Sequence, residues 1–149
     1  MWDSIFGIAN GWAMLAWAVL IFAPRGPLAG SFVMYAGVGV LCLAYVVLLG
    51  TVLAKGGGQA ADFTTIAGVQ TIFASEAGAT IGWVHYLALD LFAGLWIAKD
   101  ADAKAVSRWV QAPVLLLAFF AGPAGLLIWL AVRENRARAA ARAAGVRAK

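Results

Sequence analysis

Residues 73–100 read FASEAGATIGWVHYLALDLFAGLWIAKD, and this stretch decides how the rest of the chain is interpreted. At about 1.5 Å per residue, a helix of this length exceeds the roughly 30 Å hydrocarbon layer of a bilayer. It nevertheless carries the ionisable side chains Glu76, His85 and Asp90. A charge near the bilayer centre costs about 2.5–3.5 kcal/mol on insertion scales, so these groups need partners, a polar cavity or a function.

Helical spacing predicts two rows of side chains on this segment that do not face lipid. Glu76, Trp83 and Asp90 are seven residues apart and therefore lie close to one face. A second row, at four-then-three spacing, consists of small residues followed by a histidine: Gly78, Gly82 and His85. Because small residues let a neighbouring helix approach closely, we expect His85 to lie at such a helix contact.

The composition of the chain is that of a membrane protein. Of its 149 residues, 64% are hydrophobic and 12% are charged, which excludes the ordinary soluble globular class. The single cysteine, Cys42, excludes an internal disulfide. The N-terminus has neither a positively charged region nor a small-residue cleavage site, so we expect the first hydrophobic segment to be retained.

Four long hydrophobic segments predict an all-α, polytopic membrane protein with four transmembrane helices. These segments are residues 4–23, 31–54, 74–98 and 108–132. Apolar residues at three-residue spacing in the polar interval 59–72 predict a short helix, either in the interface or reaching back toward the site, with a plain surface connector as the alternative. Pro123 is expected to kink the middle of the fourth helix. Residues 1–132 then form the transmembrane domain, and residues 133–149 form a basic tail.

Positive charge is concentrated after the last hydrophobic segment. Six of the eleven basic residues follow Val132. This distribution is typical of the cytoplasmic side, where basic side chains also meet anionic lipid headgroups. With four crossings, we expect both termini to be cytoplasmic, in a bacterial inner membrane. No recognition motif accompanies the charge, so a nucleic-acid partner is not expected.

The polar residues of the four segments suggest a site for a hydrophobic ligand. We expect an elongated apolar pocket that suits a long lipid-soluble molecule. A carboxyl group that apolar surroundings keep protonated can act as an acid, and a histidine can act as a base. The candidate catalytic residues are Glu76, His85 and Asp90. The candidate substrate-binding residues are Asn10, Trp12, Tyr35, Tyr45, Trp83 and Phe92.

Several of these residues also have purely structural explanations. Ser75 is a candidate N-cap, which would place Glu76 in a first helical turn, where the helix dipole favours a carboxylate. Buried amides such as Asn10 commonly form hydrogen bonds between helices. With one histidine and no thiolate cluster, neither a metal nor another cofactor is expected. A proton relay is a weaker alternative, because the two carboxyl groups of the spans are few for a pump.

The third segment also resembles a known family. It resembles the abscisic-acid-deficient-four family, small plastid membrane proteins required for neoxanthin synthesis in plants, and the bacterial relatives of that family. The later Gly122-Pro123-Ala124-Gly125 run resembles the proline-glycine break of the same family. The resemblance rests most on Phe73, Ser75, Glu76, Trp83, His85, Asp90, Leu91 and Phe92.

This resemblance implies a carotenoid-type substrate and, for the plant members, conversion of the epoxide violaxanthin to the allene neoxanthin. Such a non-redox isomerisation needs an acid at the epoxide oxygen and a base for a polyene proton, and Glu76, His85 and Asp90 fit these needs. The alternative is a non-catalytic membrane protein that binds a carotenoid or lipid, or assembles with another protein. Its polar residues would then only lock helices together. Membrane lipids and a hydrophobic isoprenoid or carotenoid are the expected partners, and a homo-oligomer remains an open alternative.

Overall fold

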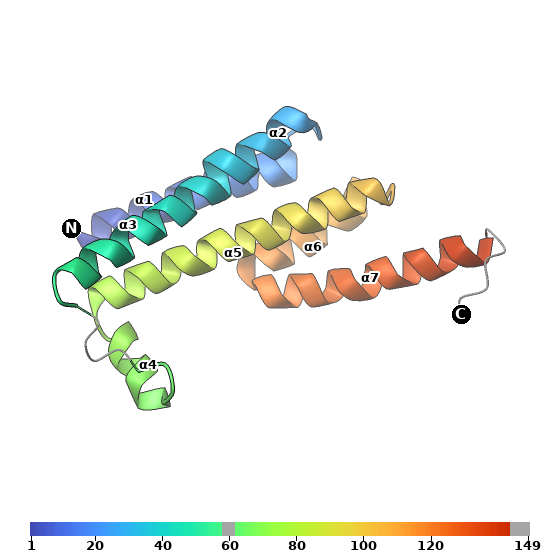
Figure 1. The fold of residues 1–149 in the computed structure, drawn as a ribbon. Helices are drawn as coiled ribbons and strands as arrows, with labels where there is room; N and C mark the ends of the chain where they lie inside the picture. Colours follow the sequence, from blue (N-terminus) through green and yellow to red (C-terminus); the bar gives the residue numbers. More distant parts are fainter. Residues whose placement is uncertain (58–61, 144–149) are drawn as a thin grey trace. The chain divides into compact units, whose positions relative to one another are not determined.

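The computed structural model describes residues 1–57 and 62–143, with side chains up to Glu134, and every regular element among them is a helix (Figure 1). The all-α class is therefore confirmed. Within these described ranges, three helices are long and apolar enough to cross a membrane. The chain divides into two compact units, Met1–Phe92 and Ala93–Lys149, and each is described by itself.

The first two predicted spans are confirmed as helices of the first unit. Helix α1 runs over Trp2–Phe22. The second span is a continuous helix made of α2 (Pro27–Ser31), η1 (Phe32–Gly39) and α3 (Val40–Ala54). It begins four residues earlier than expected. The reason is that Pro27 occupies the first turn, where its fixed φ suits the helix and its missing N–H costs no hydrogen bond.

The η1 segment is a π-helical stretch that the sequence pattern did not indicate. Its carbonyl at Ala36 accepts a hydrogen bond from Trp12 Nε1 of α1 at 2.7 Å. The neighbouring Gly37 is buried, and a Cβ atom there would lie 3.0 Å from both Ala16 Cβ and Leu91 Cδ2. Close approach of α1 and α5 to this stretch therefore depends on a residue without a side chain.

The predicted short helix before the third span is confirmed as α4 (Ile66–Phe73). Thr65 caps it by accepting a hydrogen bond from the Gly68 amide at 3.1 Å. Two residues separate α4 from helix α5 (Glu76–Ala103), and Ser75 Oγ accepts a hydrogen bond from the Gly78 amide at 2.9 Å. The predicted N-cap role of Ser75 is therefore confirmed.

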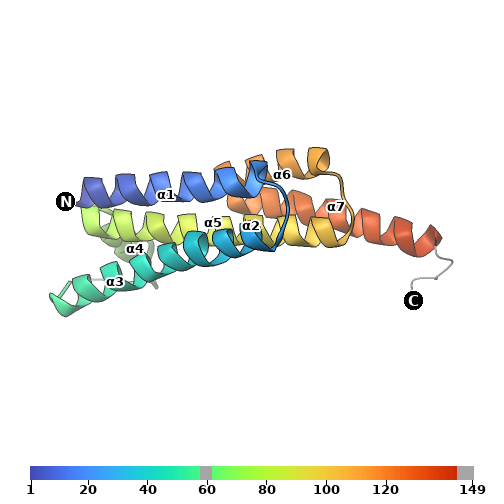
Figure 2. The same ribbon diagram turned by 90° about the horizontal axis from the view of Figure 1, so that it is seen from above.

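In the first unit, η1 contacts α5 at Gly37, where an added Cβ would lie 3.0 Å from Leu91, whereas a cavity lies between α5 and residues 49–53 of α3. Figure 2 shows α3 diverging from α5 toward Ala54, on the side where α4 lies. This divergence is the feature that positions the site described below.

The second unit contains the end of α5, then α6 (Arg108–Phe120) and α7 (Gly122–Ala143). The prediction of one kinked helix over 108–132 is wrong, because the backbone leaves the helix at Ala121 with φ −151° and ψ 80°. Pro123 occupies the first turn of α7, a position that proline favours, so it starts a helix instead of kinking one. At about 20 Å, α6 is too short to cross the hydrocarbon layer, and four spans are not confirmed.

Helices α6 and α7 pack together as a hairpin, and a carboxylate holds α7 to the end of α5. A Cβ at Gly125 would lie 2.5 Å from Ala118 of α6, so the turn requires a glycine. Asp100 accepts hydrogen bonds from Trp129 Nε1 at 3.0 Å and from Arg133 Nε at 2.8 Å. Lys104 Nζ lies 2.5 Å from the same carboxylate. Helix α7 continues to Ala143, into the predicted tail, and residues 144–149 lie outside the described part.

Candidate functional site

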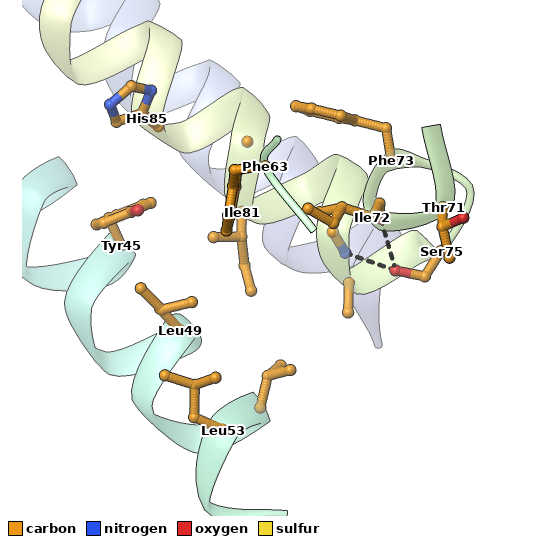
Figure 3. Close-up of a pocket in the computed structure, with 14 residues that line it drawn as sticks. Tyr45, Leu49, Leu53, Phe63, Thr71, Ile72, Phe73, Ser75, Ile81 and His85 are labelled. Carbon is orange, nitrogen blue, oxygen red and sulfur yellow. Dashed lines mark hydrogen bonds between the residues drawn. The ribbon is translucent and has the colours of Figure 1, made fainter. Parts of the chain in front are cut away.

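A cavity of about 480 Å³ lies where α3 diverges from α5, with α4 beside it (Figure 3). Its walls are mostly aliphatic and aromatic. They come from the second half of α3, from Phe63, from the last turn of α4 and from the first ten residues of α5. Apolar side chains that line it include Leu49, Leu53, Phe63, Ile72, Phe73 and Ile81. All of these residues belong to the first unit.

Two glycines of α5 allow the end of α4 to form one wall of the cavity. A Cβ atom at Gly82 would overlap the ring of Phe73, and one at Gly78 would overlap the carbonyl oxygen of Ile72. The predicted small-residue strip is therefore a contact surface, and its partner is α4 instead of a long membrane helix. His85 continues the strip and lines the same cavity, whereas its position in the row had predicted a close helix contact.

Polar groups lie at two ends of the cavity, and only one end has side chains free of local hydrogen bonds. Thr71 and Ser75 lie at the end near α4 (Figure 3). Thr71 donates to the Ala67 carbonyl at 2.9 Å, and Ser75 donates to the Ile72 carbonyl at 3.1 Å. Their hydroxyl protons are therefore already used within the chain.

The other end carries His85 on α5 and Tyr45 on α3. Their ring centroids are 5.4 Å apart, with an angle of 42° between the planes. Among the described residues, neither the His85 ring nor the Tyr45 hydroxyl has a hydrogen-bond partner. A phenol and an imidazole can each donate and accept hydrogen bonds, so this pair is available to a ligand. His85 lies about 15 Å along α5 from Ser75, which makes the cavity elongated.

The cavity is open on one side. Phe63 is 80% exposed and Phe73 is 46% exposed although both line it. His85 is also exposed. Helices α3 and α5, which line the cavity, belong to two of the candidate membrane spans.

The two predicted catalytic carboxyl groups do not line this cavity. Glu76 is exposed in the first turn of α5, directly after the cap at Ser75. Asp90 is half-buried five residues beyond His85, and its carboxylate has no hydrogen bond or ion pair within the described residues. In the described part of the chain, no three His, Cys, Asp or Glu side chains gather as a metal site would require. The structure thus does not bring Glu76, His85 and Asp90 together, and their roles stay predictions.

The predicted substrate-binding residues are divided between helix contacts, exposed positions and the cavity. Asn10 accepts a hydrogen bond from Trp83 Nε1 at 2.9 Å, and Trp12 donates one to the Ala36 carbonyl of η1. Tyr35 and Phe92 are 76% and 46% exposed. Tyr45 alone of this predicted set lines the cavity.

Sequence reasoning missed most of the apolar lining, especially Leu49, Leu53 and Ile81. Leu49 and Leu53 lie in a segment that is hydrophobic on all sides, and Ile81 lies on neither of the two rows that the sequence indicated on its helix, so no pattern distinguished their cavity-facing positions. A usable signal existed for Ile72 and Phe73. They end the helix that precedes the Gly78 and Gly82 strip, and glycines at that spacing indicate close contact.

Comparison with known proteins gives a family and no individual relative. The model of the family described as ABA DEFICIENT 4-like matches residues 4–129 of the chain. No curated protein and no solved structure matches the chain. The matched range includes the whole cavity and most of the α6–α7 hairpin.

Proposed function

The chain belongs to the ABA DEFICIENT 4-like family, and from this membership and the cavity we propose that it isomerises a carotenoid or related isoprenoid inside the bilayer. The family supports a neoxanthin synthase-like membrane protein. The step from membership to a reaction depends on one observation: His85 and Tyr45 lie together in a mostly apolar cavity, without hydrogen-bond partners among the described residues.

The size of the cavity limits how much of a carotenoid it takes. A volume of about 480 Å³ is within the range of about 300–1,000 Å³ that small-molecule sites have. One end ring with the first part of the polyene fits this elongated shape, and the remainder extends through the open side into lipid. An end-group reaction therefore suits the cavity better than a reaction at the middle of the chain.

Proton transfer is the chemistry that the lining supports. In an epoxide-to-allene isomerisation, a proton is delivered to the epoxide oxygen as its C–O bond breaks. A second proton leaves the adjacent polyene carbon, and the electron pair of that C–H bond forms the new double bond. We propose His85 as the base, because it is the basic side chain of the cavity. The sequence-based choice for the acid is Glu76 or Asp90.

Turnover in vesicles tests this proposal. Membranes that contain the full chain are supplied with violaxanthin, and pigments are separated by chromatography. Wild type should give an allene product. His85→Ala should lower the rate by about 10²–10⁴-fold, the usual contribution of a general base. Glu76→Gln and Asp90→Asn test the acid in the same membranes, and full rates in both would remove the carboxyl groups from the reaction.

A non-catalytic binding protein is the second candidate, and two observations favour it. The carboxyl groups of Glu76 and Asp90 lie outside the cavity lining. Asn10 of α1 and Trp83 of α5 form a hydrogen bond with each other, so they act as a contact between helices. If the protein only binds pigment, the purified protein should carry pigment and the vesicles should give no allene product. His85→Ala would then change only pigment affinity.

We further propose that the basic tail is cytoplasmic and that three helices cross the membrane. With α6 and α7 as a hairpin that does not cross, ten of the eleven basic residues fall on the tail's side, and Lys55 alone falls on the other. The four-crossing alternative gives a weaker bias of seven to four. This arrangement places the N-terminus on the side opposite to the C-terminus, instead of the shared cytoplasmic side expected from four spans. Reporter domains that are active only in the cytoplasm, fused to each end of the chain, test this topology. Three crossings predict activity at the C-terminus alone, and activity at both ends would support four crossings instead.

A further inference from the structure

The cavity contains an acid candidate that is not a carboxyl group. Of its hydroxyl groups, those of Thr71 and Ser75 donate to backbone carbonyls of their own segment. The Tyr45 hydroxyl has no hydrogen-bond partner among the described residues, and it shares the cavity with His85. We propose that Tyr45 is the proton donor that works with His85 as the base. This inference rests on the proposed function and replaces Glu76 or Asp90 as the acid.

The positions of the two rings suit a pair that acts on one substrate. Tyr45 extends from α3 and His85 from α5, so they approach from two walls of the cavity (Figure 3). With ring centroids 5.4 Å apart, the rings are near contact. A ring-shaped end group that lies against them therefore meets the phenol and the imidazole together, while Glu76 and Asp90 are outside the lining.

The reaction balances with these two groups alone. The Tyr45 O–H gives its proton to the epoxide oxygen as the C–O bond breaks. His85 takes the proton from the adjacent polyene carbon, and the C–H electron pair becomes part of the allene. The pair is then a phenolate and an imidazolium. Because a phenol is ordinarily the weaker acid of the two, the proton returns from His85 to Tyr45, directly or through one water, and both groups are restored. No oxidant or reductant is needed.

The chain supplies a matched control in Tyr86. Its ring also contacts His85, with centroids 6.0 Å apart and planes at 69°. Tyr86 is 56% exposed and does not line the cavity. Tyr86→Phe therefore alters a second ring that contacts His85 without removing a group that lines the cavity.

The test compares Tyr45→Phe and Tyr86→Phe in the full-length protein, in vesicles that contain violaxanthin. Bound pigment is measured by absorbance of the purified protein, and product is measured by chromatography. We expect Tyr45→Phe to bind pigment as wild type does and to lose about 10²–10⁴-fold in turnover. Tyr86→Phe should stay within about twofold of wild type in both measurements. The phenylalanine keeps the ring, so a normal pigment content also shows that the variant is folded.

The possible failures are distinguishable. If wild type forms product and Tyr45→Phe forms it equally fast, or if Tyr86→Phe loses as much as Tyr45→Phe, the donor role of Tyr45 is overturned while the proposed function stands. A Tyr45→Phe protein that no longer binds pigment assigns Tyr45 to binding and also overturns its donor role. Pigment bound by wild type without any product overturns the catalytic function and this inference together.

Discussion

Trp83 Nε1 lies 2.9 Å from Asn10 Oδ1, and this hydrogen bond joins α5 to α1 between residues 73 positions apart in sequence. The ring of Phe6 lies against the same indole, with centroids 5.8 Å apart. The Asn10 amide also donates to the Phe6 carbonyl at 2.8 Å, so both ends of the amide are engaged. Two residues that the sequence suggested for substrate binding are thus a contact between helices.

A double-mutant cycle should assign this contact to stability. Asn10→Ala and Trp83→Phe are each expected to lower the melting temperature, with a coupling energy of about 0.6 kcal/mol, the average for polar contacts between membrane helices. Thermal unfolding in detergent measures it for the single and double variants. Pigment content should be unchanged in all of them. If the variants lost pigment but kept the melting temperature of wild type, Asn10 and Trp83 would be assigned to pigment binding instead.

The position of the Phe73 ring should change when residue 82 carries a side chain. A Cβ atom at Gly82 would overlap the Phe73 ring, so Gly82→Ala should displace this ring and change the wall of the cavity. We expect a lower pigment content, measured by absorbance of the purified protein. Gly11→Ala is the matched control, because nothing lies within 4 Å of the Cβ that it adds to α1. Equal pigment content in the two variants would show that Phe73 does not shape the binding site.

The start of α4 should be sensitive to pH through Asp62. Asp62 Oδ1 accepts from the side chain and amide of Thr64 at 2.6 and 2.8 Å, and Oδ2 accepts from Thr65 at 2.8 Å. These hydrogen bonds hold the pKa of Asp62 below its ordinary value. Since the folded pKa is lowered, the stabilisation is complete above the ordinary pKa and is lost as the pH falls through the folded value.

Hydrogen exchange at the Thr64 amide measures this effect. After correction for intrinsic exchange, protection should be constant from about pH 7 to 5 and should fall in more acidic solution, below the ordinary pKa of an aspartate. Asp62→Asn keeps an oxygen acceptor and cannot titrate in this range, so its protection should not depend on pH. The same acidic loss in Asp62→Asn would show that another group is responsible.

The long helices of the first unit were predictable from sequence because hydrophobic length and proline or glycine breaks decide them. The cap at Ser75 and the short helix before it were also predictable, since both depend on local side-chain patterns. The cavity was predictable only in part. The glycine strip placed His85 at a helix contact, but the divergence of α3 from α5 depends on tertiary packing that no local pattern encodes.

The fourth predicted span is not confirmed as one helix, for a specific reason. Residues 108–132 are long and apolar enough to cross a membrane, so hydropathy alone favours one helix. The outcome is decided at Ala121, where the chain turns, and at Gly125, where only a glycine allows α7 to contact Ala118. Polar contacts of Asp100 then hold α7 to α5, and these are long-range contacts that a window of hydropathy does not detect.

Asp100 should accordingly be the residue of the second unit whose loss is most damaging. Trp129 is fully buried, and its Nε1 donates to Asp100 Oδ2, so Asp100→Ala leaves a buried donor without its acceptor and Arg133 without its ion pair. We expect the free energy of unfolding to fall by about 1–3 kcal/mol. Asp100→Asn retains an acceptor oxygen and should lose less. Lys99→Ala, an exposed charge on the same helical turn, is the control, and thermal unfolding of the three variants gives the comparison. A loss in Asp100→Ala no larger than in Lys99→Ala would mean that this carboxylate does not hold α7 in place.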